Sequence, residues 1–264
     1  MDESKVVITG STRGLGLAMA REFASRGCPV MVSGRSPEAT ETARARLQAE
    51  YPESRIAGRH CDIRRESELQ GLWDAAVEAF GAVDHWINNA GIPQSTRTIW
   101  ELGLDELRDL IDTDLLGAIQ GARVAMRGMQ RQGSGAIWFM EGHGSNGRIM
   151  RGLSVYGASK RGVRYVARAL AVEAEVTPVR IGALSPGIMI TDFTMDHVDR
   201  ASPAWERTKR IFNILADRPE RVAAFLVPRI LGNTRNGSLI AWLTPAKILF
   251  RFMTSALVRR SVVD

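Results

Sequence analysis

The sequence predicts an α/β fold, a doubly wound parallel sheet of seven strands with helices on both faces. Short runs rich in β-branched and aromatic residues alternate along the chain with longer helix-like segments, as in parallel sheets covered by helices. A glycine-rich turn follows the first run and leads into the first helix-like segment. No repeat, low-complexity run or linker divides the 264 residues, so we expect one Rossmann-type domain.

The expected elements follow one another in regular order. The strand candidates cover residues 5–9, 29–33, 55–61, 83–88, 135–140, 179–185 and 238–243. Segments with helical periodicity cover 15–26, 38–50, 66–80, 105–130, 156–175 and 219–231. The long connection at 192–217 is expected to be a substrate lid at the carboxyl edge of the sheet, with an ordinary surface excursion as the alternative. Residues 1–243 then form the nucleotide-binding domain, lid included, and 244–264 form an amphipathic helix and tail.

Composition argues against several classes of protein. The uncharged apolar runs are too short to span a membrane, and strand-like sequence begins at Lys5, so we expect no signal peptide and a cytoplasmic location. The net charge of +6 comes from dispersed arginines, which argues against a nucleic-acid partner. Cys28 and Cys61 are expected to be inert thiols without a disulfide. The four histidines lack metal-ligand spacing, so no metal site is expected.

The stretch "TGSTRGLG" predicts a nucleotide site between the first strand and the first helix. Glycines at such a turn allow a tight bend and let the backbone approach a pyrophosphate, while the helix amino terminus supplies unpaired N–H groups. A three-glycine match is weak alone, and its position between strand and helix strengthens it. The expected nucleotide contacts are Gly10, Ser11, Thr12, Arg13, Gly14, Leu15 and Gly16.

The second strand ends in "VSGRS", which favours NADP(H) over NAD(H). An NAD-selective site holds a ribose-binding carboxylate here, whereas this chain has Gly34 and Arg35. An acid would repel a 2′-phosphate, and Arg35 can hold it with a forked, charge-assisted hydrogen bond. Arg13 can approach the same phosphate.

Tyr156 and Lys160 form the candidate acid/base pair. Four residues apart on a helix, they share one face, so the ammonium can lie beside the phenol. We expect this cation to lower the pKa of Tyr156 towards neutrality and to fit it for protonating a carbonyl oxygen. The spacing itself is common, and most such pairs are not catalytic.

With "NNAG", "YGASK" and "SPGIMIT" following "TGSTRGLG" in order, the chain resembles the short-chain dehydrogenase/reductase family over nearly its whole length. The resemblance implies hydride delivery from a nicotinamide to a carbonyl carbon while Tyr156 protonates the oxygen. It also implies homo-oligomers, dimers or tetramers, built on the long helices from residues 105 and 156. Further cofactor contacts implied by it are Asp62 and Ile63 at the adenine, Asn88, Asn89, Ala90 and Gly91 in the cleft, and Pro186, Gly187 and Thr191 at the nicotinamide end.

Two departures from the family pattern affect the catalytic set. The usual serine position is held by His143 when counted from the tyrosine and by Gly142 when counted from the preceding strand. We expect Ser145 to polarise the substrate oxygen, with His143 as second choice and Glu141 as a structural residue. Asp114 stands where the family has an asparagine, and its effect on the tyrosine has no sign that the sequence fixes.

The stretches "FMEGHGS", "DHWINNAG" and "FNILADRPERVAAFLVPRIL" resemble the chlorophyll(ide) b reductase branch of the family. This implies NADPH-dependent reduction of a ring formyl group on a bulky hydrophobic pigment. Another aldehyde, ketone or alcohol is the first alternative, because ancestry does not fix substrate. A non-catalytic NADP-binding scaffold or sensor is the second, since the serine and asparagine are replaced; the retained Tyr156 and Lys160 argue for an enzyme.

The tail "TPAKILFRFMTSALVRRSVVD" predicts an amphipathic helix with Thr244 as N-cap and Pro245 in its first turn. Its apolar residues recur on one side, at Leu249, Phe250, Met253, Ala256 and Leu257, and its cations Lys247, Arg251 and Arg259 lie on another. Such a helix suits peripheral contact with an anionic membrane. Packing of the apolar face on its own domain or on another subunit is the alternative.

Overall fold

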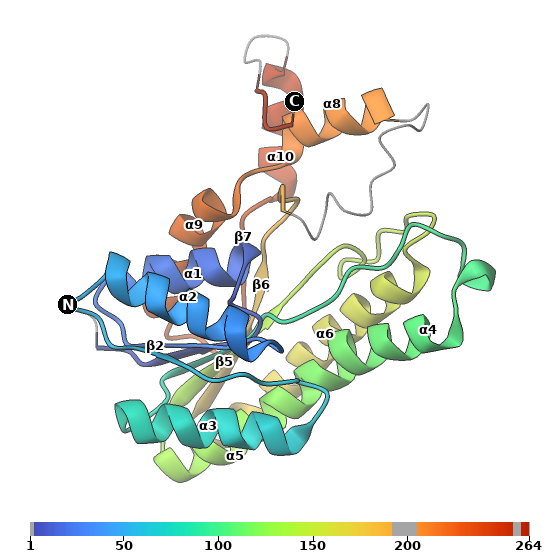
Figure 1. Cartoon of the computed structure of the whole chain (residues 1–264). Helices are drawn as coiled ribbons and strands as arrows, with labels where there is room; N and C mark the ends of the chain where they lie inside the picture. Colours follow the sequence, from blue (N-terminus) through green and yellow to red (C-terminus); the bar gives the residue numbers. More distant parts are fainter. Residues whose placement is uncertain (1–2, 192–204, 256–259, 264) are drawn as a thin grey trace.

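The computed structural model describes residues 3–191, 205–255 and 260–263. Its centre is a parallel sheet of seven strands in the order β3-β2-β1-β4-β5-β6-β7 (Figure 1). The strands are β1 (Val6–Ile8), β2 (Val30–Val32), β3 (Ile56–Gly58), β4 (His85–Asn88), β5 (Gly135–Met140), β6 (Val179–Ser185) and β7 (Ser238–Ala241). The predicted fold class and all seven strand positions are therefore confirmed. Because the strands are parallel, their carboxyl ends meet at one edge, where ligands bind in such sheets.

Helices cover both faces of the sheet (Figure 1). One face packs against α1 (Gly14–Ala24), α2 (Pro37–Glu50) and α9 (Pro219–Leu231), and the other against α3 (Glu66–Phe80), α5 (Ala118–Gln132) and α6 (Ser154–Glu173). The side chains of β1 alternate between the two cores, since Val6 and Ile8 face the first and Val7 the second. Both faces of the central strands are thus buried, as their continuous apolar runs indicated.

The predicted helix at 105–130 is interrupted. It consists of α4 (Leu104–Ile111), a π-helical turn (Asp112–Gly117) and α5. The wider turn contains Asp114, which lies buried under the carboxyl edge of the sheet. Such π-turns occur mostly as single bulges in helices and often at functional sites. Uninterrupted periodicity across this segment gave no sign of the bulge.

The remaining elements lie towards the carboxyl terminus. Of the expected lid, residues 192–204 lie outside the described residues, and the rest forms the helix α8 (Trp205–Leu215) and two further residues. The tail forms α10 (Pro245–Thr254), with the Thr244 side chain accepting a hydrogen bond from the amide of Lys247, which confirms the predicted N-cap. Ala256, Leu257 and Arg259 lie outside the described residues. Within the parts of the chain that the structure describes, none of the helices has the length and apolar character needed to cross a membrane.

Candidate active site

The glycine loop between β1 and α1 is tightly enclosed. Gly10 has a φ of +63°, and a Cβ atom there would lie 2.7 Å from the Cα of Ala90. A Cβ atom on Gly16 would lie 2.3 Å from the carbonyl oxygen of Gly10. The side chain of Asn89 donates to the carbonyls of Thr9 and Gly10 at 2.9 and 3.0 Å, which ties the loop to the end of β4. Only glycine fits these positions, so the backbone itself forms the surface at this edge.

This loop fits a dinucleotide phosphate. Arg13 precedes α1 in an extended conformation and its side chain makes no capping hydrogen bond within the described residues. The first amides of α1 therefore stay available to an anion. Thr12 packs against Gly34, where a Cβ atom would lie 2.7 Å from the threonine methyl. Ser11 has a structural role, since its buried hydroxyl donates to Ile8 and accepts from the amide of Ser33, and Leu15 is buried in the core.

Arginines gather where the adenosine end of a dinucleotide would lie. Arg13 and Arg35 are exposed at the ends of neighbouring strands β1 and β2. The Asp62 carboxylate is held by a fork from Arg64, with a shortest distance of 2.7 Å between Nη2 and Oδ2. Arg64 accounts for most of the lowering of the Asp62 pKa, and Arg35 adds to it. Ile63 lies buried beneath Gly117 of the π-turn.

The nicotinamide end of the predicted site is formed by the segments after β4 and β6. Asn88 accepts a hydrogen bond from Trp86 at 3.0 Å, while its buried amide nitrogen has no hydrogen-bond partner in the described structure. After β6, Pro186 leads into Gly187, whose φ is +76° and whose Cα faces the Leu243 side chain. The methyl of Thr191 lies 3.8 Å from the position that a Cβ on Gly14 would take. The loop after β6 thus reaches back to the start of α1.

Tyr156 and Lys160 share one buried face of α6 (Figure 1 shows the helix). The Lys160 ammonium nitrogen lies 5.6 Å from the centroid of the Tyr156 ring. The pKa of Tyr156 is raised, first by burial and then by the Asp114 carboxylate. The expectation that this pKa is lowered towards neutrality is therefore wrong for the protein alone, because burial and Asp114 both raise it. Tyr156 keeps its proton through the neutral range.

Asp114 joins this pair from the π-turn. Its Oδ1 accepts a hydrogen bond from the amide of Ile92 at 2.7 Å. Gly91 lies between the two charges, since a Cβ atom there would be 2.9 Å from Asp114 Oδ1 and 3.3 Å from Lys160 Nζ. Burial raises the pKa of Asp114 and Lys160 opposes that rise. Its effect on Tyr156 now has a sign, because the ionised carboxylate disfavours the phenolate.

The loop after β5 leaves no room for a side chain at 142, one of the two positions considered for the usual serine. Gly142 lies against the Tyr156 hydroxyl, and a Cβ atom on it would be 2.4 Å from that oxygen. A serine at this position would displace the tyrosine. The Ser145 hydroxyl instead donates to the carbonyl of Lys160 and accepts from the amide of Gly142, both at 3.1 Å. Its single proton is already used, so it can donate to a substrate oxygen only by giving up the bond to α6.

His143 has the open hydrogen-bonding position. Its Nε2 is buried and has no hydrogen-bond partner among the described residues. Burial and then Arg148 lower its pKa, which favours the neutral ring. A neutral imidazole can donate one hydrogen bond to a substrate oxygen. Of the two candidates, His143 has a ring nitrogen without a partner among the described residues, whereas the Ser145 proton is already used; the choice between them stays a prediction.

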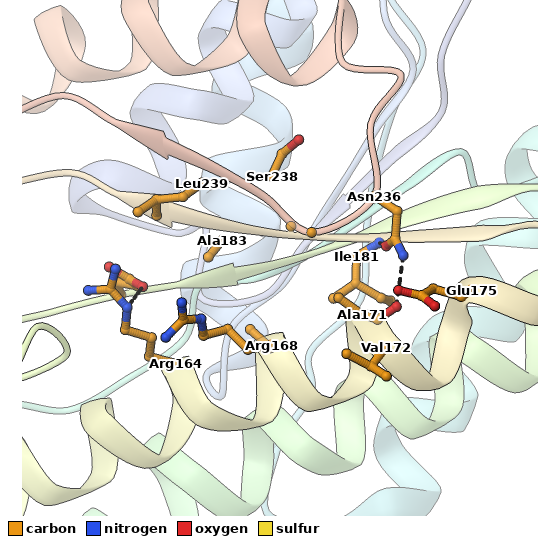
Figure 2. A pocket seen from close by; sticks show the side chains of 14 residues that line it. Arg164, Arg168, Ala171, Val172, Glu175, Ile181, Ala183, Asn236, Ser238 and Leu239 are labelled. Atoms are coloured by element: carbon orange, nitrogen blue, oxygen red, sulfur yellow. Dashed lines mark hydrogen bonds and ion pairs between the residues drawn. The ribbon is translucent and has the colours of Figure 1, made fainter.

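Glu141 turns away into a separate groove between α6 and the strands β6 and β7. Its carboxylate pairs with Arg164 at 3.3 Å, and burial raises its pKa while Arg164 opposes that effect. Arg164 and Arg168 both point into this groove (Figure 2). The expected structural role of Glu141 agrees with this ion pair.

Sequence reasoning missed Gln94. This residue is 2% exposed, and its side-chain oxygen accepts from the amides of Val155 and Tyr156 at 3.1 and 2.8 Å. It therefore caps the first turn of α6 from a distant loop, while the local residue Leu153 makes no side-chain cap. No local sequence signal could have identified it, because 62 residues separate it from Tyr156.

Comparison with known proteins identifies the family of this chain. The family model described as short chain dehydrogenase matches residues 4–202. The probable chlorophyll(ide) b reductase NYC1, chloroplastic, of Arabidopsis thaliana is 35% identical over 96% of this chain and 53% of its own length. Chlorophyll(ide) b reductase NOL, chloroplastic, of Oryza sativa subsp. japonica is 35% identical over 94% of this chain and 74% of its own. The chain thus spans about half the length of the NYC1 relatives.

Solved structures share the whole fold. Levodione reductase superposes with a TM-score of 0.83 at 25% identity, covering 92% of this chain and 97% of the other. A variant of actinorhodin polyketide ketoreductase with NADPH superposes with a TM-score of 0.81 at 28% identity, and the match covers 91% of this chain and 96% of the other. With its family model matched over most of its length and its tyrosine and lysine brought together at the carboxyl edge of the sheet, this chain belongs to the short-chain dehydrogenase family.

Proposed function

We propose that this protein is an NADPH-dependent reductase that acts on the carbonyl of a bulky hydrophobic substrate. One observation carries the proposal. The Tyr156 hydroxyl lies against the bare backbone of Gly142 at the end of β5, and its raised pKa keeps the proton on it. A buried phenol that keeps its proton is suited to giving that proton to a carbonyl oxygen rather than taking one from an alcohol.

Each catalytic residue then has a defined task. The dinucleotide, when bound, supplies the hydride. Tyr156 protonates the substrate oxygen, and Lys160 supplies positive charge beside it to stabilise the phenolate that the transfer leaves. Asp114 holds the Ile92 backbone and limits how far that phenolate is favoured. His143 polarises the oxygen through its open Nε2, and Ser145 fixes the loop to α6.

NADPH is the proposed form of the cofactor because exposed Arg13 and Arg35 lie where a 2′-phosphate would need cations. The related ketoreductase structure carries NADPH. Arg35→Asp is expected to weaken NADPH binding by more than ~2 kcal/mol and NADH binding far less, since a forked contact is lost and repulsion added. Arg131→Asp, on the distant α5, is the charge-matched control. Equal weakening of both cofactors by Arg35→Asp would contradict the assignment.

A large apolar substrate is supported by the loops above the site. The segments after β4 and β5 touch where Gly152 packs on Thr96. Together they expose Ile99, Trp100, Ile149 and Met150, the tryptophan at 81% and Ile149 at 98%. Exposed apolar side chains on the two loops that precede α4 and α6 favour a hydrophobic ligand. The relatives named as chlorophyll(ide) b reductases make the formyl group of that pigment the first substrate to test.

The test is consumption of NADPH with purified protein and a panel of chlorophyllide b and unrelated aldehydes and ketones. The expected result is turnover of chlorophyllide b, with Tyr156→Phe binding NADPH normally and showing no turnover. If the protein turned over only other carbonyl compounds, it would be a reductase or dehydrogenase of a different substrate, which is the first alternative. NADPH binding without turnover of any substrate would favour the scaffold or sensor.

A homo-oligomer is proposed alongside this function. The helices α4 and α6 and the turn between α4 and α5 expose apolar side chains, namely Leu104, Ile111, Leu116, Tyr165 and Val172. A shared apolar face on neighbouring helices is typical of subunit contacts. Light scattering of the purified protein decides between dimer, tetramer and monomer. The cytoplasmic location stays a prediction, and the plant relatives carry chloroplastic in their names.

A further inference from the structure

The polarity of α10 is reversed relative to an ordinary surface helix. Its one buried residue is Arg251, which is 9% exposed. Its apolar side chains face outward, with Leu249, Phe250 and Met253 exposed at 63%, 65% and 72% and Phe252 at 46%. A surface helix places its apolar residues inward. The outer face of α10 therefore needs a cover that the described part of this chain does not supply.

The buried carboxylate of Asp217 enforces this orientation. Its oxygens pair with Arg251 at 2.7 Å and Arg260 at 2.6 Å, and one accepts from the indole of Trp242 at 2.7 Å. Rotating α10 to bury its apolar face would pull Arg251 away from a carboxylate that is 1% exposed. Leaving a buried charge unpaired costs several kcal/mol. Arg251, predicted on the basic side of the helix, is buried against Asp217, and the apolar side therefore points outward.

A cationic groove lies next to that face, between α8 and α10, where the two helices project together from the body of the molecule (Figure 1). Its volume is about 860 Å³. Glu206 is the single carboxylate residue among its described lining residues, and Phe250 lines it as well as lying on the apolar face. The cations that line it are Lys209, Arg210, Arg221, Lys247, Arg251 and Arg260.

Burial and, after it, repulsion by Arg251 lower the pKa values of two cations in this groove. The pKa of Lys247 is lowered to about 8, first by burial and then by Arg251, while Asp217 opposes the effect. The pKa of Arg260 is lowered as well, again with burial as the main cause and Arg251 contributing. An anion in the groove would relieve this repulsion, because opposite charge favours the protonated forms.

We propose that this end of the molecule docks on an anionic lipid bilayer, with phosphate headgroups in the groove and Leu249, Phe250 and Met253 among the acyl chains. A soluble phosphate would pair with the cations and leave the apolar face uncovered. A neutral apolar partner would cover the face but add no negative charge to the groove, whose cations outnumber the Asp217 carboxylate. The surface of an anionic bilayer satisfies both features side by side, since apolar area and basic charge together determine interfacial binding.

The docking end is connected to the active site through Asp217. Its backbone pairs with the segment after β6, with Ile190 donating to Asp217 at 3.1 Å and Asp217 donating to Ile188 at 3.0 Å. The same segment forms the nicotinamide end of the predicted cofactor site. Docking would hold the carboxyl edge of the sheet beside the bilayer, where a hydrophobic substrate dissolves. The inference stands on its own features and does not require the proposed reductase activity.

The test is co-sedimentation of the full chain with phosphatidylcholine vesicles that do or do not contain phosphatidylglycerol. Binding is expected only with phosphatidylglycerol and is expected to fall with added salt. Arg210→Glu should weaken it at least about fivefold, and Lys209→Glu with Arg210→Glu at least about 25-fold. These residues lie outside the Asp217 cluster, so the fold is kept. Arg131→Glu on α5 has the same change in charge as Arg210→Glu and should bind like the parent chain.

The double substitution Leu249→Ser with Met253→Ser tests the apolar face. It should also weaken vesicle binding at least about fivefold, because apolar side chains are no longer buried in the bilayer. Turnover of a water-soluble aldehyde, where the parent chain shows it, reports on the active site separately. Equal binding to neutral vesicles, or equal weakening by Arg131→Glu, would overturn the proposal. So would stabilisation by inorganic phosphate without vesicle binding, which indicates a soluble anion. A dimer lost in the serine variant, again without vesicle binding, would assign the face to a second copy of the chain.

Discussion

His143 and Ser145 lie two residues apart in one loop but have different expected roles. His143→Ala is expected to lower kcat roughly 10- to 1000-fold, because the open Nε2 donor to the substrate oxygen is removed. Ser145→Ala is expected to lower kcat less and to lower the free energy of unfolding by ~1–3 kcal/mol, because the amide of Gly142 and the carbonyl of Lys160 lose their partner. Steady-state kinetics and urea unfolding on both variants measure the two effects. The opposite pairing of effects would restore Ser145 as the polarising group.

Asp114 controls when Tyr156 can lose its proton. Since the carboxylate raises the pKa of Tyr156, Asp114→Asn is expected to lower that pKa. In the oxidation of an alcohol Tyr156 must accept a proton, so the rate rises as pH climbs through this pKa. The rising limb of kcat/KM against pH should therefore move to lower pH in Asp114→Asn. Asp112→Asn, on the same π-turn, is the control, and an unmoved limb in Asp114→Asn would show that the carboxylate does not act on the phenol.

The sequence predicted the catalytic pair and the glycine loop because each lies within a short stretch of chain. It did not predict Gln94, which caps α6 across 62 residues, nor the hydrogen bonds that occupy Ser145. It also gave the pKa of Tyr156 the wrong direction, because spacing reveals the neighbouring cation while burial depends on the packed fold. Local chemistry is readable from a sequence; the partners that other segments bring are not.

Among the helices, α3 and α5 owe their contact to one glycine. A Cβ atom on Gly128 would lie 2.1 Å from the Trp73 ring, so the helices approach closely only without a side chain there. Gly128→Ala is expected to lower the free energy of unfolding by about 1–2 kcal/mol, with overpacking outweighing the higher helix propensity of alanine. Gly103→Ala, where nothing lies within 4 Å, should cost less than about 1 kcal/mol. Denaturant unfolding of both variants gives the comparison, and equal losses would contradict the packing argument.

Elements with a clear local period were predicted well. All seven strands lie where β-branched runs placed them, and α3 and α9 have the predicted bounds. The π-turn escaped prediction because it depends on burial of Asp114 against the Ile92 backbone, which periodicity does not encode. The orientation of α10 was not predicted either, because it depends on a contact distant in the sequence. Asp217 lies 34 residues before Arg251, and its ion pair with Arg251 determines which face of the helix is buried.

At the level of the fold as a whole, the tail and the sheet domain depend on each other through Asp217. Truncation after Leu243 removes Arg251 and Arg260 and leaves a buried carboxylate without those two cations. The free energy of unfolding is expected to fall by ~3–5 kcal/mol. Asp217→Asn in the truncated chain should recover part of that loss, because a neutral amide needs no counter-ion. Chemical denaturation of the two truncated chains measures this, and equal stability would mean that solvent reaches the carboxylate freely.

The contact between Gly142 and the Tyr156 hydroxyl also limits how this catalytic arrangement can change over generations. A single substitution to serine at 142 would place an atom 2.4 Å from the hydroxyl and push the proton donor out of place. A lineage that returned to the family's usual serine would first have to shift α6 or the end of β5, and its intermediates would carry a misplaced tyrosine. A side chain at the strand end therefore requires a matching displacement of α6 or of its tyrosine.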